Sequence, residues 1–124
     1  MRRILATAVV IAALATAAAA AQFKNIASPQ AKALLDSGAV FLLDVRTPEE
    51  FRQAHLKGAV LIPLDQVEKR LGELPKNRPI LVYCAVGSRS SAVAGFLAEK
   101  GYRDIYNMKD GIVGWYRNNL PIVR

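Results

Sequence analysis

Residues 80–90 read ILVYCAVGSRS, and the interpretation of the whole sequence starts from this stretch. The four apolar residues at 80–83 are typical of a buried strand. The small and polar residues at 84–89 predict a tight turn, and a helix is expected from about residue 90 to residue 100. A buried strand that passes through a short turn directly into a helix indicates an α/β fold with a parallel sheet.

On both sides of this stretch, short apolar runs alternate with amphipathic segments. The apolar runs predict four further strands, at residues 23–26, 40–45, 60–62 and 105–107. Further helices are predicted at residues 29–37, 48–54, 65–71 and 112–118, the first with Ser28 as its N-cap and the second opened by the capping box Thr47-Pro48-Glu49-Glu50. The alternation predicts an α/β fold of three layers, in which helices cover both faces of a five-stranded parallel sheet.

Two of the predicted strands end in residues that can do chemistry. Asp44 and Arg46 lie at the end of one strand, and Cys84 follows another. In open parallel sheets the ligand crevice lies beyond the carboxyl ends of the strands. The sequence therefore predicts a functional site at this edge, with Cys84 at its centre.

The turn after Cys84 has the composition of an anion-binding loop. Successive backbone N–H groups in such a turn can face inward, and the N-terminus of the next helix adds positive potential. These groups lower the pKa of a thiol and would equally stabilise the anion of a persulfide. Cys84 is therefore the predicted catalytic residue, and the predicted substrate-binding residues are Ala85, Val86, Gly87, Ser88, Arg89, Ser90 and Arg46. A buried, inert cysteine in a Gly/Ser turn is the structural alternative.

Other polar residues have simpler structural explanations. Arg46 is predicted either to attract an anionic substrate or to form an internal ion pair, with Glu50 as a partner. His55 is expected to make a structural hydrogen bond. Because one Cys and one His are too few for a zinc site, neither a metal nor another cofactor is expected.

Residues 1–21 have the pattern of a secretory signal peptide. Arg2 and Arg3 precede a mostly apolar segment, and Ala19-Ala20-Ala21 offers a cleavage site. The prediction is an exported, most simply periplasmic, domain of residues 22–124 without a stable membrane anchor. An uncleaved anchor is the alternative. The chain carries a net charge of +7, but its basic residues are scattered, so a nucleic-acid partner is not expected.

Several motifs, in order along nearly the whole of residues 22–124, resemble those of a single rhodanese domain. They are Leu43-Asp44-Val45-Arg46, Glu49-Glu50-Phe51, His55-Leu56-Lys57-Gly58-Ala59, Ile62-Pro63-Leu64, Tyr83-Cys84 with the loop to Ser90, Gly101-Tyr102, and Asp110-Gly111-Ile112 with Trp115. One departure is Ala54, where the family often has Gly. The resemblance implies a five-stranded parallel sheet and a catalytic cysteine, here Cys84, at the start of a six-residue loop. Related phosphatases and arsenate reductases have a loop one residue longer, so the resemblance favours sulfur over phosphate chemistry.

The resemblance implies a thiosulfate sulfurtransferase. Cys84 would take the sulfane sulfur of thiosulfate or a similar donor as a persulfide and pass it to cyanide or a thiol. The alternative is a sulfur carrier that exchanges sulfur with a protein donor or acceptor. A phosphatase or arsenate reductase is the third possibility, against which the loop length argues.

Overall fold

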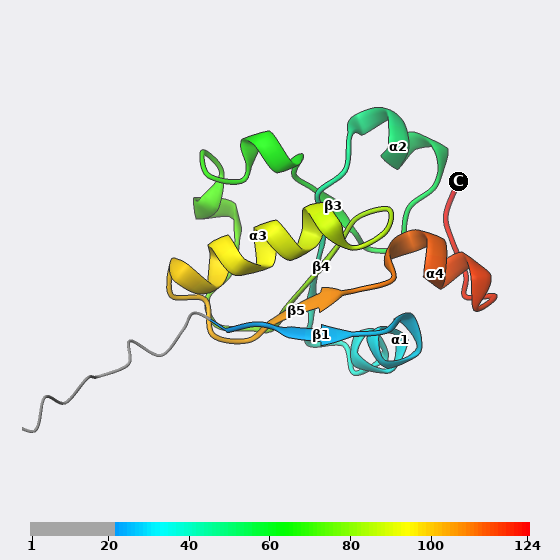
Figure 1. Cartoon of the computed structure of the whole chain (residues 1–124), viewed down its shortest axis with the longest axis horizontal. Helices are drawn as coiled ribbons and strands as arrows, with labels where there is room; N and C mark the ends of the chain where they lie inside the picture. Colours follow the sequence, from blue (N-terminus) through cyan, green and yellow to red (C-terminus); the bar gives the residue numbers. More distant parts are fainter. Residues whose placement is uncertain (1–21) are drawn as a thin grey trace, which may run out of the picture.

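Five parallel strands form one sheet in the computed structural model, which describes residues 22–124 (Figure 1). The strands are β1 (Lys24–Ile26), β2 (Phe41–Asp44), β3 (Val60–Leu61), β4 (Ile80–Tyr83) and β5 (Ile105–Met108). Their spatial order is β1-β5-β4-β2-β3, and every neighbouring pair is parallel. The central strand β4 is buried along its whole length, as its continuous apolar run predicts. The predicted signal peptide, residues 1–21, lies outside the described residues.

Helices cover both faces of the sheet, which confirms the predicted α/β fold of three layers. The helices are α1 (Ser28–Asp36), α2 (Pro48–Gln53), α3 (Ser88–Glu99) and α4 (Gly111–Arg117), with short 3₁₀ helices at η1 (Leu64–Gln66) and η2 (Leu71–Glu73). In one apolar cluster, residues of α3 pack on the sheet with Val67 and Leu74. In the other cluster, α1 and α4 pack on the opposite face through Ala31 and Trp115. Figure 1 shows α3 and α1 on opposite sides of β1 and β5.

The predicted helix at residues 65–71 is wrong. The structure has the two separate 3₁₀ turns η1 and η2 there. The hydroxyl of Tyr102 donates to the carbonyl oxygens of Leu71 and Leu74, at 3.1 and 3.4 Å. The Leu71 carbonyl oxygen also accepts the Leu74 amide at 3.0 Å, so Tyr102 binds the short turn η2 on both sides. The Tyr102–Leu71 contact joins residues 31 positions apart, which local spacing cannot predict.

The prediction that Ser28 caps the first helix is also wrong. The N-cap of α1 is Ala27, and no side chain of the helix's own start caps it. Instead, the carboxylate of Asp110 accepts hydrogen bonds from the Ser28 amide, at 3.0 Å, and from the Ser28 hydroxyl, at 2.6 Å. A carboxylate from the start of α4 thus satisfies one of the free amides of α1. This contact ties together the two helices on one face of the sheet.

The register of β2 and β4 brings two predicted strand ends together. Asp44 lies opposite Tyr83, and the Val45 amide donates to the Tyr83 carbonyl oxygen at 3.2 Å. Arg46 and Cys84 therefore follow neighbouring strands at the same edge of the sheet. Within residues 22–124, no helix has the length and apolar character needed to cross a membrane.

Candidate active site

The loop after β4 is shorter than the sequence predicted. Helix α3 begins at Ser88 rather than near Ser90, so Ser88 and Arg89 belong to its first turn. Gly87, with φ of 98°, takes the left-handed conformation that allows the chain to enter the helix at once. A Cβ on Gly87 would also overlap the carbonyl group of Lys109. The result is a helix N-terminus that lies directly against the sulfur of Cys84.

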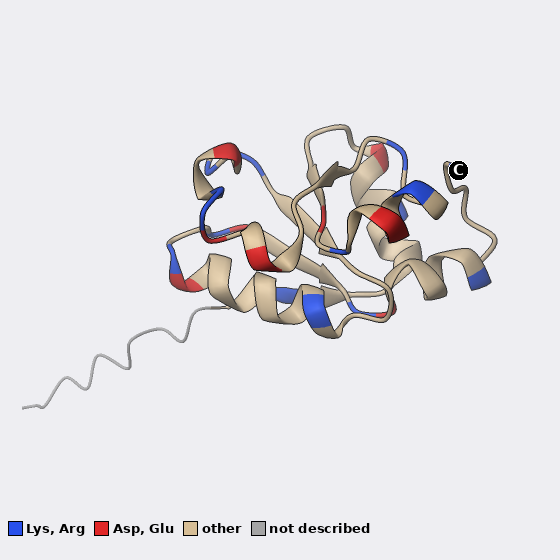
Figure 2. Ribbon diagram, turned by 90° about the horizontal axis from the view of Figure 1, so that it is seen from above, with Lys and Arg blue, Asp and Glu red and all other residues tan. Residues whose placement is uncertain are grey.

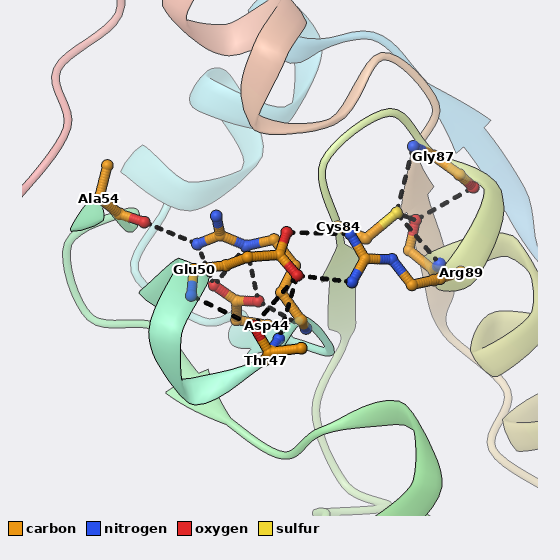
Figure 3. A network of polar contacts seen from close by, with 9 residues as sticks. Asp44, Thr47, Glu50, Ala54, Cys84, Gly87 and Arg89 are labelled. Carbon is orange, nitrogen blue, oxygen red and sulfur yellow. Dashed lines mark hydrogen bonds and ion pairs between the residues drawn. The ribbon is translucent and has the colours of Figure 1, made fainter. Parts of the chain in front are cut away.

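The Cys84 sulfur lies at the focus of three polar groups (Figure 3). The Gly87 amide donates to Sγ at 3.2 Å and the Ser90 amide at 3.4 Å. The Ser90 hydroxyl lies 3.3 Å from Sγ, and either of the two atoms can be the donor. Cys84 is fully buried, as the structural alternative expected, but polar groups surround its sulfur. Burial in this case does not mean an apolar environment.

These contacts determine the acidity of the thiol. Burial raises the pKa of Cys84, because a buried thiolate loses its hydration. Hydrogen bonds from Ser90 and from the Gly87 amide outweigh burial and hold the pKa below its ordinary value. Lowered thiol pKa values at helix N-termini are a property of reactive cysteines. The hydrogen bonds to Sγ therefore raise the thiolate fraction of Cys84 above that of an ordinary cysteine.

The Ser90 hydroxyl has two possible acceptors and one proton. It lies 3.2 Å from the Gly87 carbonyl oxygen as well as 3.3 Å from the sulfur. With a neutral thiol, the S–H can donate to Ser90 while the hydroxyl donates to Gly87. With a thiolate, the hydroxyl can rotate and donate to the sulfur. Ser90 can thus stabilise both protonation states without moving its backbone.

The start of α4 holds the loop from outside, a feature that the sequence analysis missed. The amides of Ile112 and Val113 donate to the carbonyl oxygens of Cys84 and Ala85, at 2.9 and 3.1 Å. Gly111 has a φ of 62°, and a Cβ there would overlap the backbone of Ala85 and Val86. The carbonyl groups of Cys84 and Ala85 thus point toward α4, on the outside of the loop. The amides of Gly87 and Ser90, which follow in the chain, point toward the sulfur. In the sequence, the Asp110-Gly111 pair could have indicated this contact, but no role in the site was predicted for it.

Arg89 does not contact the sulfur by a hydrogen bond. Its guanidinium donates to both carboxylate oxygens of Glu50, at 2.8 and 3.0 Å, as Figure 3 shows. Glu50 also completes the predicted capping box of α2 with Thr47. The ion pair with Arg89 lowers the pKa of Glu50 to about 2. Arg89 is therefore paired with a carboxylate, while its charge still lies near Cys84, and its role in substrate binding stays a prediction.

Arg46 is held in a buried ion pair of its own. Its Nε and Nη2 donate to the Asp44 carboxylate, at distances of 2.7 to 3.2 Å, and Nη2 also donates to the Ala54 carbonyl oxygen at 2.7 Å. The predicted pairing of Arg46 with Glu50 is wrong, because Asp44 is the partner. The geometry gives Arg46 a structural role at the end of β2, and its role in substrate binding stays a prediction.

The remaining predicted residues lie around the entrance of the loop. Val86 and Ser88 are exposed and Ala85 is half-buried. His55 makes the expected structural contacts: Nδ1 lies 2.8 Å from the Phe51 carbonyl oxygen, and its ring stacks on that of Phe51. Residues 22–124 contain no group of Cys, His, Asp and Glu suited to a metal ion. Lys and Arg are spread over several separate elements of the ribbon (Figure 2).

Several known proteins with similar sequences are named sulfurtransferases. A family model for the rhodanese-like domain matches residues 27–118. A sulfurtransferase of Allochromatium vinosum is 38% identical over 90 residues, which are 73% of this chain and 84% of that protein. The thiosulfate sulfurtransferase GlpE of Tolumonas auensis is 37% identical over 94 residues, or 76% of this chain and 89% of that protein.

Solved structures agree with these sequence matches. A rhodanese-related protein of Thermoplasma volcanium superimposes with a TM-score of 0.73 at 28% identity, over 81% of this chain and 97% of that one. A rhodanese-like domain protein of Staphylococcus aureus has a TM-score of 0.69 at 35% identity, over 74% and 90% of the two chains. With the family model, these matches show that the chain belongs to the rhodanese-like family.

Proposed function

We propose that this protein transfers sulfane sulfur through a persulfide on Cys84, with thiosulfate or a similar anion as the donor. The observation that carries the proposal is the set of donors around the sulfur, from Gly87 and Ser90. They stabilise a negative charge at Sγ, which is needed both for the attacking thiolate and for the persulfide. The similarity to sulfurtransferases supports the reaction class.

In the first half-reaction, the Cys84 thiolate attacks the outer sulfur of thiosulfate. A new S–S bond forms at Sγ while the bond to the sulfonate sulfur breaks, and sulfite leaves with that electron pair. In the second half-reaction, cyanide or a thiolate attacks the outer sulfur of the persulfide, and the electron pair of the broken bond returns to Sγ. Two half-reactions through one covalent intermediate give ping-pong kinetics.

The protein's groups contribute electrostatics and position rather than proton transfer. Amides at the N-terminus of α3 are fixed before the reaction, so no reorganisation is needed when charge builds up on sulfur. The nearby Arg89 adds positive potential that favours anionic donors, although Glu50 partly offsets it. The lowered pKa of the Cys84 thiol increases the fraction of thiolate, which supports attack without a general base.

The decisive experiment is the intact mass of residues 22–124 before and after thiosulfate, followed by cyanide. We expect the gain of one sulfur atom, its loss to cyanide as thiocyanate, and steady turnover with both reactants. Cys84→Ser should show none of these, while retaining the fold. A Cys84→Ser protein that still forms thiocyanate would refute the proposal.

The same experiment separates the enzyme from a sulfur carrier. A carrier would gain the sulfur atom, but would pass it only slowly to cyanide or small thiols and would need a protein acceptor or donor. Cys84-dependent hydrolysis of an aryl phosphate, with no sulfur adduct, would instead indicate a phosphatase.

We also propose that the protein is exported, because residues 1–21 have the basic, apolar and small-residue regions of a signal peptide. In a Gram-negative host, the mature protein should be found in the periplasmic fraction with a mass that begins at Gln22. A full-length mass in the membrane fraction would contradict cleavage and favour an anchor.

A further inference from the structure

A groove of about 510 Å³ opens beside the active-site loop. Its walls come from α2, from the length of α4 and from the C-terminal segment. Its apolar lining consists of Ala54, Ala85, Ile112, Val113, Tyr116 and Ile122. Ala85, the residue after Cys84, is the one residue of the loop among the lining residues of the groove, so the groove borders the loop, although Cys84 itself does not line it. Tyr116 is 59% exposed and Val113 36% exposed, which means that part of this apolar wall faces solvent.

The groove does not match the proposed donor. Thiosulfate has no carbon body, and its charged groups would gain nothing from an apolar wall. Pockets of about 300–1,000 Å³ with mainly apolar walls and a few polar groups hold larger organic molecules. The groove therefore suits the second reactant of the proposed sulfur transfer.

The charges at the groove are mainly positive. Glu50 and Arg46 both line it, but Glu50 is paired with Arg89, and Arg46 is paired with Asp44 through Nε and Nη2. Nη1 of Arg46 makes no hydrogen bond within the described residues. Arg117 and Arg124, also in the lining, form no ion pair with any residue in 22–124. A ligand with a carboxylate fits this balance of charge.

From these observations we propose that the groove binds the sulfur acceptor, and that this acceptor is an organic thiol with an apolar body and a carboxylate. The inference rests on the proposed function, since it concerns the second half-reaction at Cys84. The thiol loses its proton to solvent and its sulfur attacks the outer sulfur of the persulfide. One S–S bond forms, the bond to Sγ breaks, and the product leaves as an organic persulfide while the Cys84 thiolate is restored. Because the persulfide extends about 2 Å beyond Sγ, the reacting sulfur lies farther out than the buried thiol.

The test compares acceptors that differ in one feature at a time. At saturating thiosulfate, kcat/KM is measured for 2-mercapto-3-phenylpropanoate, for mercaptoacetate without the apolar body, for 2-phenylethanethiol without the carboxylate, and for cyanide. We expect the phenyl acid to exceed mercaptoacetate by at least about tenfold, as burial of a group larger than a methylene predicts. It should exceed 2-phenylethanethiol by a few-fold at low salt, because exposed arginines give modest, screened attraction.

Matched variants locate the effect in the groove. Val113→Asp places a negative charge in the groove wall, and we expect the kcat/KM ratio of the phenyl acid to cyanide to fall about tenfold or more. Val60 is as exposed as Val113, at 38%, but lies on β3 outside the groove, so Val60→Asp should leave that ratio unchanged. Arg117→Ala should lower the preference for the phenyl acid over 2-phenylethanethiol, whereas Arg103→Ala, outside this groove, should not.

A binding measurement separates failure of the groove from failure of the reaction. The compound 3-phenylpropanoate has the body and the carboxylate but no thiol, and it should shift the backbone amide signals of Val113 and Tyr116 in a nuclear magnetic resonance titration. Equal kcat/KM values for the phenyl acid and mercaptoacetate, or an unchanged ratio in Val113→Asp, would overturn the groove assignment while the persulfide reaction stands. If the wild-type protein gains no sulfur adduct from thiosulfate, the proposed function itself is wrong, and the acceptor assignment is wrong with it.

Discussion

Arg46 and Arg89 lie near the same edge of the sheet and have the same charge, but their surroundings differ. The side chains of Arg46 and Asp44 are 5% and 0% exposed, whereas those of Arg89 and Glu50 are 34% and 31% exposed. The first pair lies within the fold behind the site, and the second borders the loop where solvent reaches it. The difference indicates that Arg46 maintains structure, whereas solvent weakens the pairing of Arg89 with Glu50.

The largest expected effect is on the buried pair. Asp44→Ala leaves the Arg46 guanidinium buried without its carboxylate, and such a change costs about 3–5 kcal/mol of the free energy of unfolding. Urea denaturation measures this cost. Asp36→Ala, which removes an exposed pair with Lys32, is the control and should cost less than about 1 kcal/mol. Equal losses for both variants would contradict the structural role of Arg46.

A second prediction asks whether hydrogen-bond donors or Arg89 lower the pKa of Cys84. Ser90→Ala removes the hydroxyl 3.3 Å from the sulfur, so the pKa of Cys84 should rise. An ultraviolet titration of the thiolate measures this change, and the rate of persulfide formation near neutral pH should fall by several-fold. Ser91→Ala, one residue along the helix, is the control. A larger rise in Arg89→Gln than in Ser90→Ala would make the guanidinium the main source of the shift.

A third prediction concerns the strength of the half-exposed pair. A double-mutant cycle with Glu50→Gln and Arg89→Gln should give a coupling energy of roughly 0.2–1 kcal/mol, because solvent screens pairs of this exposure. The same cycle applied to KM for thiosulfate shows whether Glu50 holds Arg89 away from the anion. In that case Glu50→Gln lowers KM, and an unchanged or higher KM would show that the pair has no such role.

The smallest predicted effect is the pH dependence of this pair. The folded-state pKa of Glu50, about 2, lies below its ordinary value of 4.5, so the unfolded chain binds the proton more tightly. The contribution of the ionised Glu50 to the free energy of unfolding is therefore fully present above about pH 4.5 and is lost as the pH falls toward 2. At this exposure it amounts to less than about 1 kcal/mol. Stability curves of wild type and Glu50→Gln should converge in this acid window, and parallel curves would contradict the ion pair.

Local sequence patterns predicted several parts of the site. The capping box of Thr47 and Glu50 was confirmed, because it depends on four consecutive residues. The parallel sheet and the position of Cys84 at a strand end were also confirmed, since apolar runs and the following turn are local signals. The predicted start of α3 was two residues late, because Ser88 and Arg89 resemble turn residues unless the conformation of Gly87 is known.

The sequence by itself determined that this protein is an α/β domain in which a cysteine follows a buried strand and precedes a helix. Only the tertiary structure decided that Arg89 pairs with Glu50, 39 positions away, and that α4 holds the loop carbonyls. The physical reason is the distance along the sequence between the residues that interact. Strand and helix patterns arise from neighbours along the chain, whereas a long charged side chain can reach several partners, and packing of distant elements determines which one it meets.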